Sequence, residues 1–202
     1  MFILGIIIGL VLGIGITYLI TRLRTVKTSI VASSVVARRS IKTAHLRLED
    51  DNIIVPALTE EFDPQKEFRR KGIWMSENFE EYVLNPTQPF TNIPEMSFSK
   101  HSLKTVTPDN DIISELEINP NKFLTRGQIL LTISSLTSKQ AQGQEGPLLV
   151  ENYMATIIGY FICDDGVVRV AYVDWDADSG EWDCRCGELD DWNGGSDVLA
   201  CN

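Results

Sequence analysis

LLVENYMATIIGYFICDDGVVRVAYVDWDADSGEWDCRC, residues 148–186, contains three runs that are rich in apolar and β-branched residues. Two short polar stretches, DDG and DADSG, separate these runs and are typical of tight hairpin turns. The middle run places Val168, Val170 and Tyr172 on one face and the alternate residues on the other, so that one face is more apolar. The stretch therefore predicts three strands of a small antiparallel β-meander.

The meander belongs to a strongly acidic tail. Residues 151–202 carry two basic and twelve acidic side chains, and residues 46–150 carry ten basic and sixteen acidic ones. Residues 1–45 carry six basic side chains and no acidic one. Because nucleic-acid binding needs a basic face, this distribution argues against a nucleic-acid partner. The acidic tail is instead expected to bind protein subunits with basic surfaces, because opposite charges favour association.

Proline punctuates the segment that precedes the meander. All eight prolines fall within residues 48–147, and few periodic segments survive between them. Ser76 followed by ENFEEYVLN predicts a short capped helix, and residues 121–139 fit a helix or a strand. The segment as a whole predicts an extended arm with short helices that runs along partner subunits.

The amino-terminal end has the character of a membrane segment. Residues 1–20, MFILGIIIGLVLGIGITYLI, contain no charged side chain. A helix of about 21 residues spans about 31 Å, close to the thickness of the hydrocarbon core of a bilayer. The run lacks the basic start and the small-residue cleavage site of a signal peptide. Residues 1–21 therefore predict a transmembrane helix.

Three glycines recur at four-residue spacing within this apolar run. Gly5, Gly9 and Gly13 fall on one helical face, as in two overlapping GxxxG motifs. Such a face lets a second helix approach closely in lipid, so the glycines predict helix packing and a homo-oligomer through this segment. The alternative is that they reflect only the high glycine content of membrane helices.

A basic segment follows the apolar run. Residues 22–47 are compatible with a helical stalk, and their charges suit anionic lipid headgroups. By the positive-inside rule they place the amino terminus outside and the acidic domain on the cytoplasmic side of the membrane. The basic residues that flank the membrane are Arg22, Arg24, Lys27, Arg38, Arg39 and Lys42.

The four cysteines leave three interpretations open. Cys163, Cys184, Cys186 and Cys201 lie in the last forty residues, with a C-x-C pair where a zinc knuckle normally has C-x2-C. They could form two disulfides, which requires an oxidising compartment and conflicts with the predicted orientation. They could also be reduced, half-buried thiols, or ligands of a metal ion.

A possible calcium loop overlaps the second turn. Asp174, Asp176 and Asp178 alternate as in the first half of a calcium-binding loop. Ser179 replaces the glycine of that loop, and Arg185 replaces its bidentate glutamate. A polar hairpin turn with solvent-facing aspartates is the simpler interpretation.

Tryptophan is concentrated in the same region. Trp175, Trp182 and Trp192 lie within eighteen residues of one another. They could form an interface or ligand platform, or the core of a small β-domain.

No signature of catalysis is present in the sequence. It contains no nucleophile elbow, zinc-protease motif, phosphate-binding loop or dinucleotide fingerprint, so neither enzyme activity nor a cofactor is expected. The predicted fold class is α+β: a transmembrane helix (1–21), a basic stalk (22–47), an extended arm (48–147) and an acidic β-domain (148–202).

The predicted function is structural. A single-pass, membrane-anchored subunit of a large assembly fits these features, either linking membrane to capsid in a virion with an internal membrane or within a membrane protein complex. The alternative is a membrane-tethered binding module that faces the exterior, with disulfides and a tryptophan or calcium ligand site.

Overall fold

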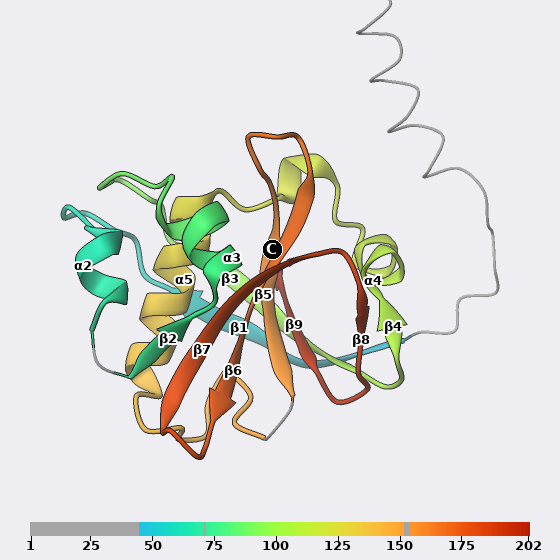
Figure 1. Ribbon diagram of the computed structural model, residues 1–202. Coiled ribbons are helices and arrows are strands. Elements are labelled where there is room, and N and C mark those ends of the chain that lie inside the picture. Colours follow the sequence, from blue (N-terminus) through green and yellow to red (C-terminus); the bar gives the residue numbers. More distant parts are fainter. Residues whose placement is uncertain (1–44, 71, 152–153) are drawn as a thin grey trace, which may run out of the picture. The chain divides into compact units, whose positions relative to one another are not determined.

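A seven-stranded mixed sheet forms the centre of the structure (Figure 1). The computed structural model describes residues 45–70, 72–151 and 154–202, which belong to one unit from Ala44 to Asn202. In the order in which they lie in the sheet, the strands are β1 (Leu46–Val55), β3 (Met96–Leu103), β9 (Asp197–Cys201), β5 (Ala155–Ile162), β6 (Val168–Asp176), β7 (Glu181–Glu188) and β2 (Ile73–Met75). A two-stranded sheet of β4 (Thr107–Pro108) and β8 (Asp191–Trp192) accompanies it.

The helical elements are short, and side-chain caps begin several of them. Asp63, Ser76 and Thr125 each accept a hydrogen bond from the backbone of the helix that follows, which satisfies amide groups that have no partner within the helix. The capped helix that was expected after Ser76 is confirmed as α3 and the π-helical turn η1. The helical elements are α2 (Pro64–Phe68), α3 (Glu77–Phe79), η1 (Glu80–Leu84), α4 (Asp109–Glu115), the 3-10 turn η2 (Pro120–Lys122) and α5 (Arg126–Lys139).

Two apolar cores lie on the sheet. The larger one joins α5, α2 and α3 with strand residues such as Phe98, Phe161 and Trp182. The smaller one joins Ile112 of α4 with Tyr160, Val170 and other residues of β1, β3, β5, β6 and β9. Helices therefore cover parts of both faces, and buried apolar area on each side stabilises the sheet.

The predicted fold class is wrong. The three strands expected in residues 148–186 are present as β5, β6 and β7, but they pair into the same sheet as β1 and β3, which come from the supposed extended arm. The prolines stand at the ends of elements: Pro64 begins α2, Pro120 begins η2, and Pro108 precedes α4. Proline cannot donate to a helix or strand ladder, so it separates short elements here.

A second correction concerns the description of the chain as a single-pass transmembrane protein of a virion or capsid, which the described structure does not support. Within the described residues, no helix is long and apolar enough to cross a membrane. The predicted transmembrane helix of residues 1–21 and the stalk up to residue 44 lie outside the described residues.

The sheet opens between its two central strands. Within the described residues, the parallel pairing of β9 with β5 covers only Thr156 with Asp197 and Ile157 with Val198. The pairing of β5 with β6 is irregular just beyond, between Ile157 and Gly159. The segment after η2 fills part of this opening, because the Leu124 amide donates to the carbonyl oxygen of Tyr160 at 3.0 Å. A Cβ atom on Gly159 would lie 2.7 Å from Leu124 Cδ1, so an alanine at this position would displace the Leu124 side chain.

Candidate functional site

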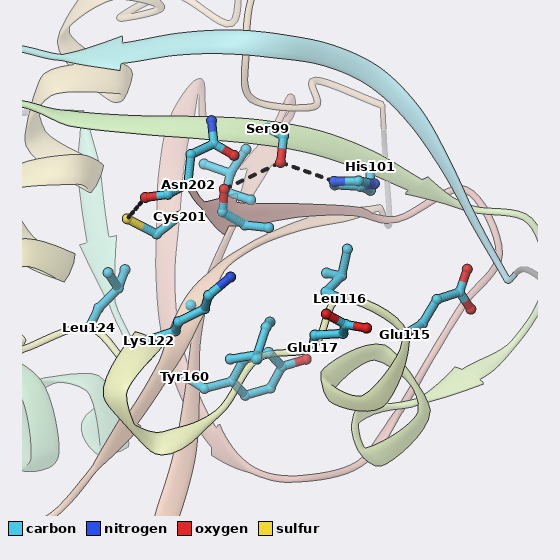
Figure 2. A pocket seen from close by; sticks show the side chains of 14 residues that line it. Ser99, His101, Glu115, Leu116, Glu117, Lys122, Leu124, Tyr160, Cys201 and Asn202 are labelled. Carbon is cyan, nitrogen blue, oxygen red and sulfur yellow. Dashed lines mark hydrogen bonds between the residues drawn. The ribbon is translucent and has the colours of Figure 1, made fainter. Parts of the chain in front are cut away.

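A pocket of about 310 Å³ lies where β9 and β5 separate (Figure 2). Strands β3 and β9 provide one wall, and the end of α4 with the segment around η2 provides the other. The volume is at the lower end of the range for ligand sites, which limits the occupant to a small molecule. The apolar part of the lining comes from Leu116, Ile118, Leu124, Tyr160 and Leu199.

A serine and a histidine face this pocket from the same strand. Ser99 and His101 are two residues apart on β3, so their side chains lie on one face, and Ser99 Oγ is 3.0 Å from His101 Nε2. Ser99 Oγ also donates to the carbonyl oxygen of Ala200 at 3.4 Å. Burial lowers the pKa of His101, against a smaller opposing effect of Glu115. The histidine is therefore held as a neutral hydrogen-bonding group at pH 7.

Two charged side chains stand at the rim of the pocket. Figure 2 shows Lys122 on one side and Glu117 on the other, with Ser99 and His101 above them. Both are exposed, and neither has an ion pair or side-chain hydrogen bond among the described residues. Glu115, by contrast, is occupied, because its carboxylate accepts from the backbone amides of His45 and Leu46 at 2.9 and 3.1 Å.

Glu117 has an unusual backbone. Its φ of 52° lies in the left-handed region, two residues after the end of α4. The amide of Glu117 donates to the carbonyl oxygen of Ser114, and the amide of Ile118 donates to that of Ile113. These bonds form a Schellman motif, in which glycine is the preferred residue at the position that Glu117 occupies. A charged side chain is thus held at the pocket rim at a conformational cost.

A second, larger hollow of about 740 Å³ lies over β6, β7 and the segment around β8. Four carboxylates line it, against one guanidinium, that of Arg185. We call this feature the acidic groove; its acidic residues are Asp174, Glu188, Asp190 and Asp191. The last three are exposed and have no ion pair within the part of the chain that the structure describes.

Aromatic rings form part of the acidic groove. Tyr172 and Trp192 meet edge to face with ring centroids 4.8 Å apart. The indole Nε1 of Trp192 donates to Asp109 Oδ1 at 2.8 Å, which fixes the ring. Tyrosine and tryptophan are enriched at protein-binding surfaces, so the pair is a candidate contact for a protein partner.

Asp109 is the buried centre of the polar contacts behind the groove. It is 1% exposed and accepts from three donors: the Tyr160 hydroxyl at 2.6 Å, the Trp192 indole and the Asp190 amide at 2.8 Å. Its own amide donates to the carbonyl oxygen of Asp190 at 2.9 Å. Burial raises the pKa of Asp109, and the three hydrogen bonds only partly offset this.

The predicted calcium residues do not converge. The carboxylate of Asp174 pairs with Arg185 at 3.2 Å, and burial raises the pKa of Asp174. Asp176 accepts from the Ser179 hydroxyl at 2.8 Å and from the Asp178 amide at 2.9 Å, as in a polar turn. Among the described residues, no group of three His, Cys, Asp or Glu side chains could hold a metal ion.

The four cysteines are free thiols within the described residues. Cys163, Cys184 and Cys186 are buried in the larger core, and burial raises the pKa of Cys184 and, to about 12, that of Cys186. Cys201 is partly exposed and lines the pocket between β9 and β5. It is therefore the thiol with access to solvent.

The three predicted tryptophans occupy different environments. Trp182 is 1% exposed, and its indole donates to the carbonyl oxygen of Gln140 at 2.9 Å. Trp175 is partly buried and meets Trp182 edge to face at 5.2 Å. Trp192 lines the acidic groove, away from the larger core. The most exposed indole is Trp74 on the edge strand β2, beneath the guanidinium of Arg185.

The remaining predicted residues lie outside the described part of the chain. These are the helix-packing candidates Gly5, Gly9 and Gly13, and the basic residues Arg22, Arg24, Lys27, Arg38, Arg39 and Lys42.

Sequence reasoning missed both the pocket and Asp109. The i, i+2 spacing of Ser99 and His101 places both side chains on one face of a strand. This spacing was not used in the prediction, because the segment was predicted to be an extended arm. Asp109 follows Pro108 at the start of a helix, which is a common place for an acidic residue and gives no sign of burial. Comparison of the chain with family models, curated proteins and solved structures finds no match.

Proposed function

We propose that this protein is a membrane-anchored structural subunit of a larger assembly, and that its acidic groove binds a basic surface of another subunit. The observation that carries the proposal is the composition of the groove. Three exposed carboxylates without ion pairs in the described structure lie beside a fixed Tyr172–Trp192 pair.

The charge of the whole domain supports a basic partner. Residues 46–202 hold twelve Lys and Arg and all twenty-eight Asp and Glu, a net charge of −16. Such a domain repels itself, and a cationic partner relieves that repulsion and is attracted to it at long range. The one cation of the groove is already engaged, because Arg185 pairs with Asp183 at 2.6 Å and with Asp174 at 3.2 Å.

The aromatic pair can contribute binding affinity that exposed charges alone do not provide. Exposed ion pairs contribute little to affinity in water, whereas Trp and Tyr often dominate binding energy at interfaces. Trp192 has one fixed orientation, since Asp109 binds its indole from behind, and little rotational freedom is lost when a partner packs on it. We therefore assign the aromatic pair to affinity and the carboxylates to steering.

The chain itself offers one basic partner. Residues 22–42 contain six Lys and Arg and no acidic residue, directly after twenty residues without charge. We propose that the uncharged segment holds the protein at a membrane and that the basic residues keep the acidic domain on the cytoplasmic side. In that arrangement the basic stretch of a neighbouring copy is available to the groove.

The test measures binding of a synthetic peptide of residues 22–42 to the full-length protein by fluorescence anisotropy. A variant with Glu188→Gln, Asp190→Asn and Asp191→Asn should bind about tenfold more weakly or worse. The matched control carries Asp51→Asn, Glu60→Gln and Glu61→Gln, which remove the same charge from exposed positions elsewhere, and should lose less than about threefold. Equal losses in the two variants would show that only net charge matters and that the groove is not the site.

Salt dependence gives the second readout. Raising the salt concentration to about 1 M shortens the Debye length to about 3 Å and should weaken the binding strongly. Replacing Tyr172 by Ala should weaken binding at every salt concentration, because ring contacts are not screened. Binding that is indifferent to both the salt and the ring would contradict the proposal.

A further inference from the structure

We propose that the pocket between β9 and β5 binds a small zwitterion of the α-amino-acid class, with the carboxylate of the ligand at Lys122 and its ammonium group at Glu117. The site shares no lining residue with the acidic groove. The inference rests on the shape of the pocket, on the two rim charges and on the backbone of Glu117.

The pocket exists because the central strands part. Pairing between β9 and β5 stops after Ile157 and Val198, while β9 continues beside β3 through Cys201. The opening reaches both cores, since it is lined by Leu199 of the larger core and Tyr160 of the smaller one. A volume of about 310 Å³ suits a molecule the size of an amino acid and is too small for a folded partner.

The charges at the rim are complementary to a zwitterion. Lys122 and Glu117 line the same pocket, and neither is engaged by another side chain in the described residues. Figure 2 places them on opposite sides of the opening. A ligand with one positive and one negative group can satisfy both at once, whereas a simple anion or cation would satisfy one and be repelled by the other.

The wall between the two charges has both polar and apolar parts. Ser99 and His101 present a hydroxyl and an imidazole, and the lowered pKa of His101 makes its ring neutral at pH 7. Leu116, Ile118 and Leu124 provide apolar surface. The site therefore favours an amino acid with an aliphatic side chain, and leucine is a suitable probe for binding experiments.

The backbone of Glu117 is an independent indication. A non-glycine residue in the left-handed region costs free energy, and such residues cluster at functional sites. Glycine would satisfy the same Schellman motif without that cost. The position nevertheless carries a carboxylate that has no partner in the described structure and faces a ligand-sized pocket.

The pocket contains its own reporter group. Cys201 lines it and is partly exposed, whereas the other three cysteines are buried. Burial raises the pKa of Cys201, so alkylation is followed at about pH 9, where enough thiolate is present. Leucine should slow the alkylation of Cys201 in the full-length protein saturably, with a dissociation constant of about 1 mM, as expected for a small ligand at a partly open site.

Two analogues test the charge assignment without any mutation. 3-Methylbutylamine lacks the carboxylate and keeps its ammonium group at about pH 9, and N-acetylleucine lacks the ammonium group. Each should bind about tenfold more weakly than leucine or worse, because each loses one charge-assisted hydrogen bond. Failure of leucine to protect Cys201 at about 20 mM, or equal protection by all three compounds, would overturn the proposal.

Two variants assign the ends of the ligand. Lys122→Gln should remove the preference for leucine over 3-methylbutylamine, and Glu117→Gln should remove the preference for leucine over N-acetylleucine. The matched controls Lys66→Gln and Glu61→Gln change exposed residues outside the pocket and should keep both preferences. If both pocket variants keep both preferences, the ligand is not held by these two charges. Because the analogue panel uses unmutated protein, a variant that fails to fold does not remove the test.

Discussion

Asp109→Asn should destabilise the domain more than any surface change of equal charge. The native carboxylate accepts three hydrogen bonds, two at Oδ1 and one at Oδ2, at a position that is 1% exposed. Asparagine keeps the volume but has a single acceptor oxygen. Whichever way its amide turns, at least one donor among the Tyr160 hydroxyl, the Trp192 indole and the Asp190 amide faces an NH₂ group.

The loss of stability in Asp109→Asn can be estimated from the number of donors left without an acceptor. A buried donor without an acceptor costs about 1–3 kcal/mol, and relief of the desolvation of the charged carboxylate offsets part of it. We expect a net loss of about 2 kcal/mol in the free energy of unfolding, or a fall in Tm of about 4–8 °C for a domain of this size. Asp111→Asn is the matched control, because Asp111 lies in the same helix, is exposed, and should change stability by less than about 0.5 kcal/mol.

The difference in unfolding free energy between the native protein and Asp109→Asn should also depend on pH, in a direction set by the pKa of Asp109. The pKa of Asp109 is raised in the folded protein, so the folded state binds more protons than the unfolded state above about pH 4. The contribution of Asp109 is therefore complete below that pH and is lost as the pH rises through the raised pKa. The difference between the native protein and Asp109→Asn should shrink over this window, as measured by urea unfolding at several pH values. A variant as stable as Asp111→Asn, or a difference that grows with pH, would refute the argument.

Three further predictions follow from particular residues. Glu117→Gly should stabilise the protein by up to about 1 kcal/mol in thermal unfolding, because glycine adopts the left-handed backbone without strain. The same variant should lose the discrimination against N-acetylleucine. A destabilised variant would contradict the assignment of strain. Gly159→Ala should cost about 1 kcal/mol, since its Cβ would meet Leu124 Cδ1 at 2.7 Å, and the same substitution should cost less in a Leu124→Ala background than in the native chain. Titration of the thiols with a slow alkylating reagent should label Cys201 first and the other three cysteines only on unfolding. Rapid labelling of all four in the folded protein would show that the buried cysteines are accessible to the reagent.

The sequence was sufficient for elements that depend on near neighbours. The turn at DADSG, with Asp176 accepting from Ser179 and Asp178, uses contacts within four residues and was visible as a turn pattern. The helix after Ser76 was visible for the same reason, because its cap is a local bond between Ser76 Oγ and the amide of Phe79. The segment around residues 121–139 stayed ambiguous because its apolar residues fit two periods. The structure resolves it as α5, which starts at the capping box of Thr125 and Gln128.

Long-range pairing was the part that the sequence could not supply. Strand β1 is mostly exposed between Arg47 and Asn52, so it lacks the apolar alternation that identifies a strand. It is held by its pairing with β3, and its register contains two irregularities. In the same way β9 enters the centre of the sheet from the end of the chain, between strands that come from positions about one hundred and about forty residues earlier. No local pattern marks either event, and the proline-rich segment was therefore assigned to an arm.

Both candidate sites lie where the pairing of strands ends, and this explains why they were invisible in the sequence. The pocket begins at the point where β9 leaves β5, and the acidic groove lies where the chain leaves β7 for the short pair of β4 and β8. Each site draws on residues far apart in the chain: Ser99 and Cys201 for the pocket, Asp109 and Trp192 for the support of the groove. A pattern search along the sequence finds residues that act with their neighbours. Here strand topology brings the functional side chains together. The backbone anomaly at the pocket, a glutamate with a left-handed conformation after α4, becomes apparent only when the backbone is known.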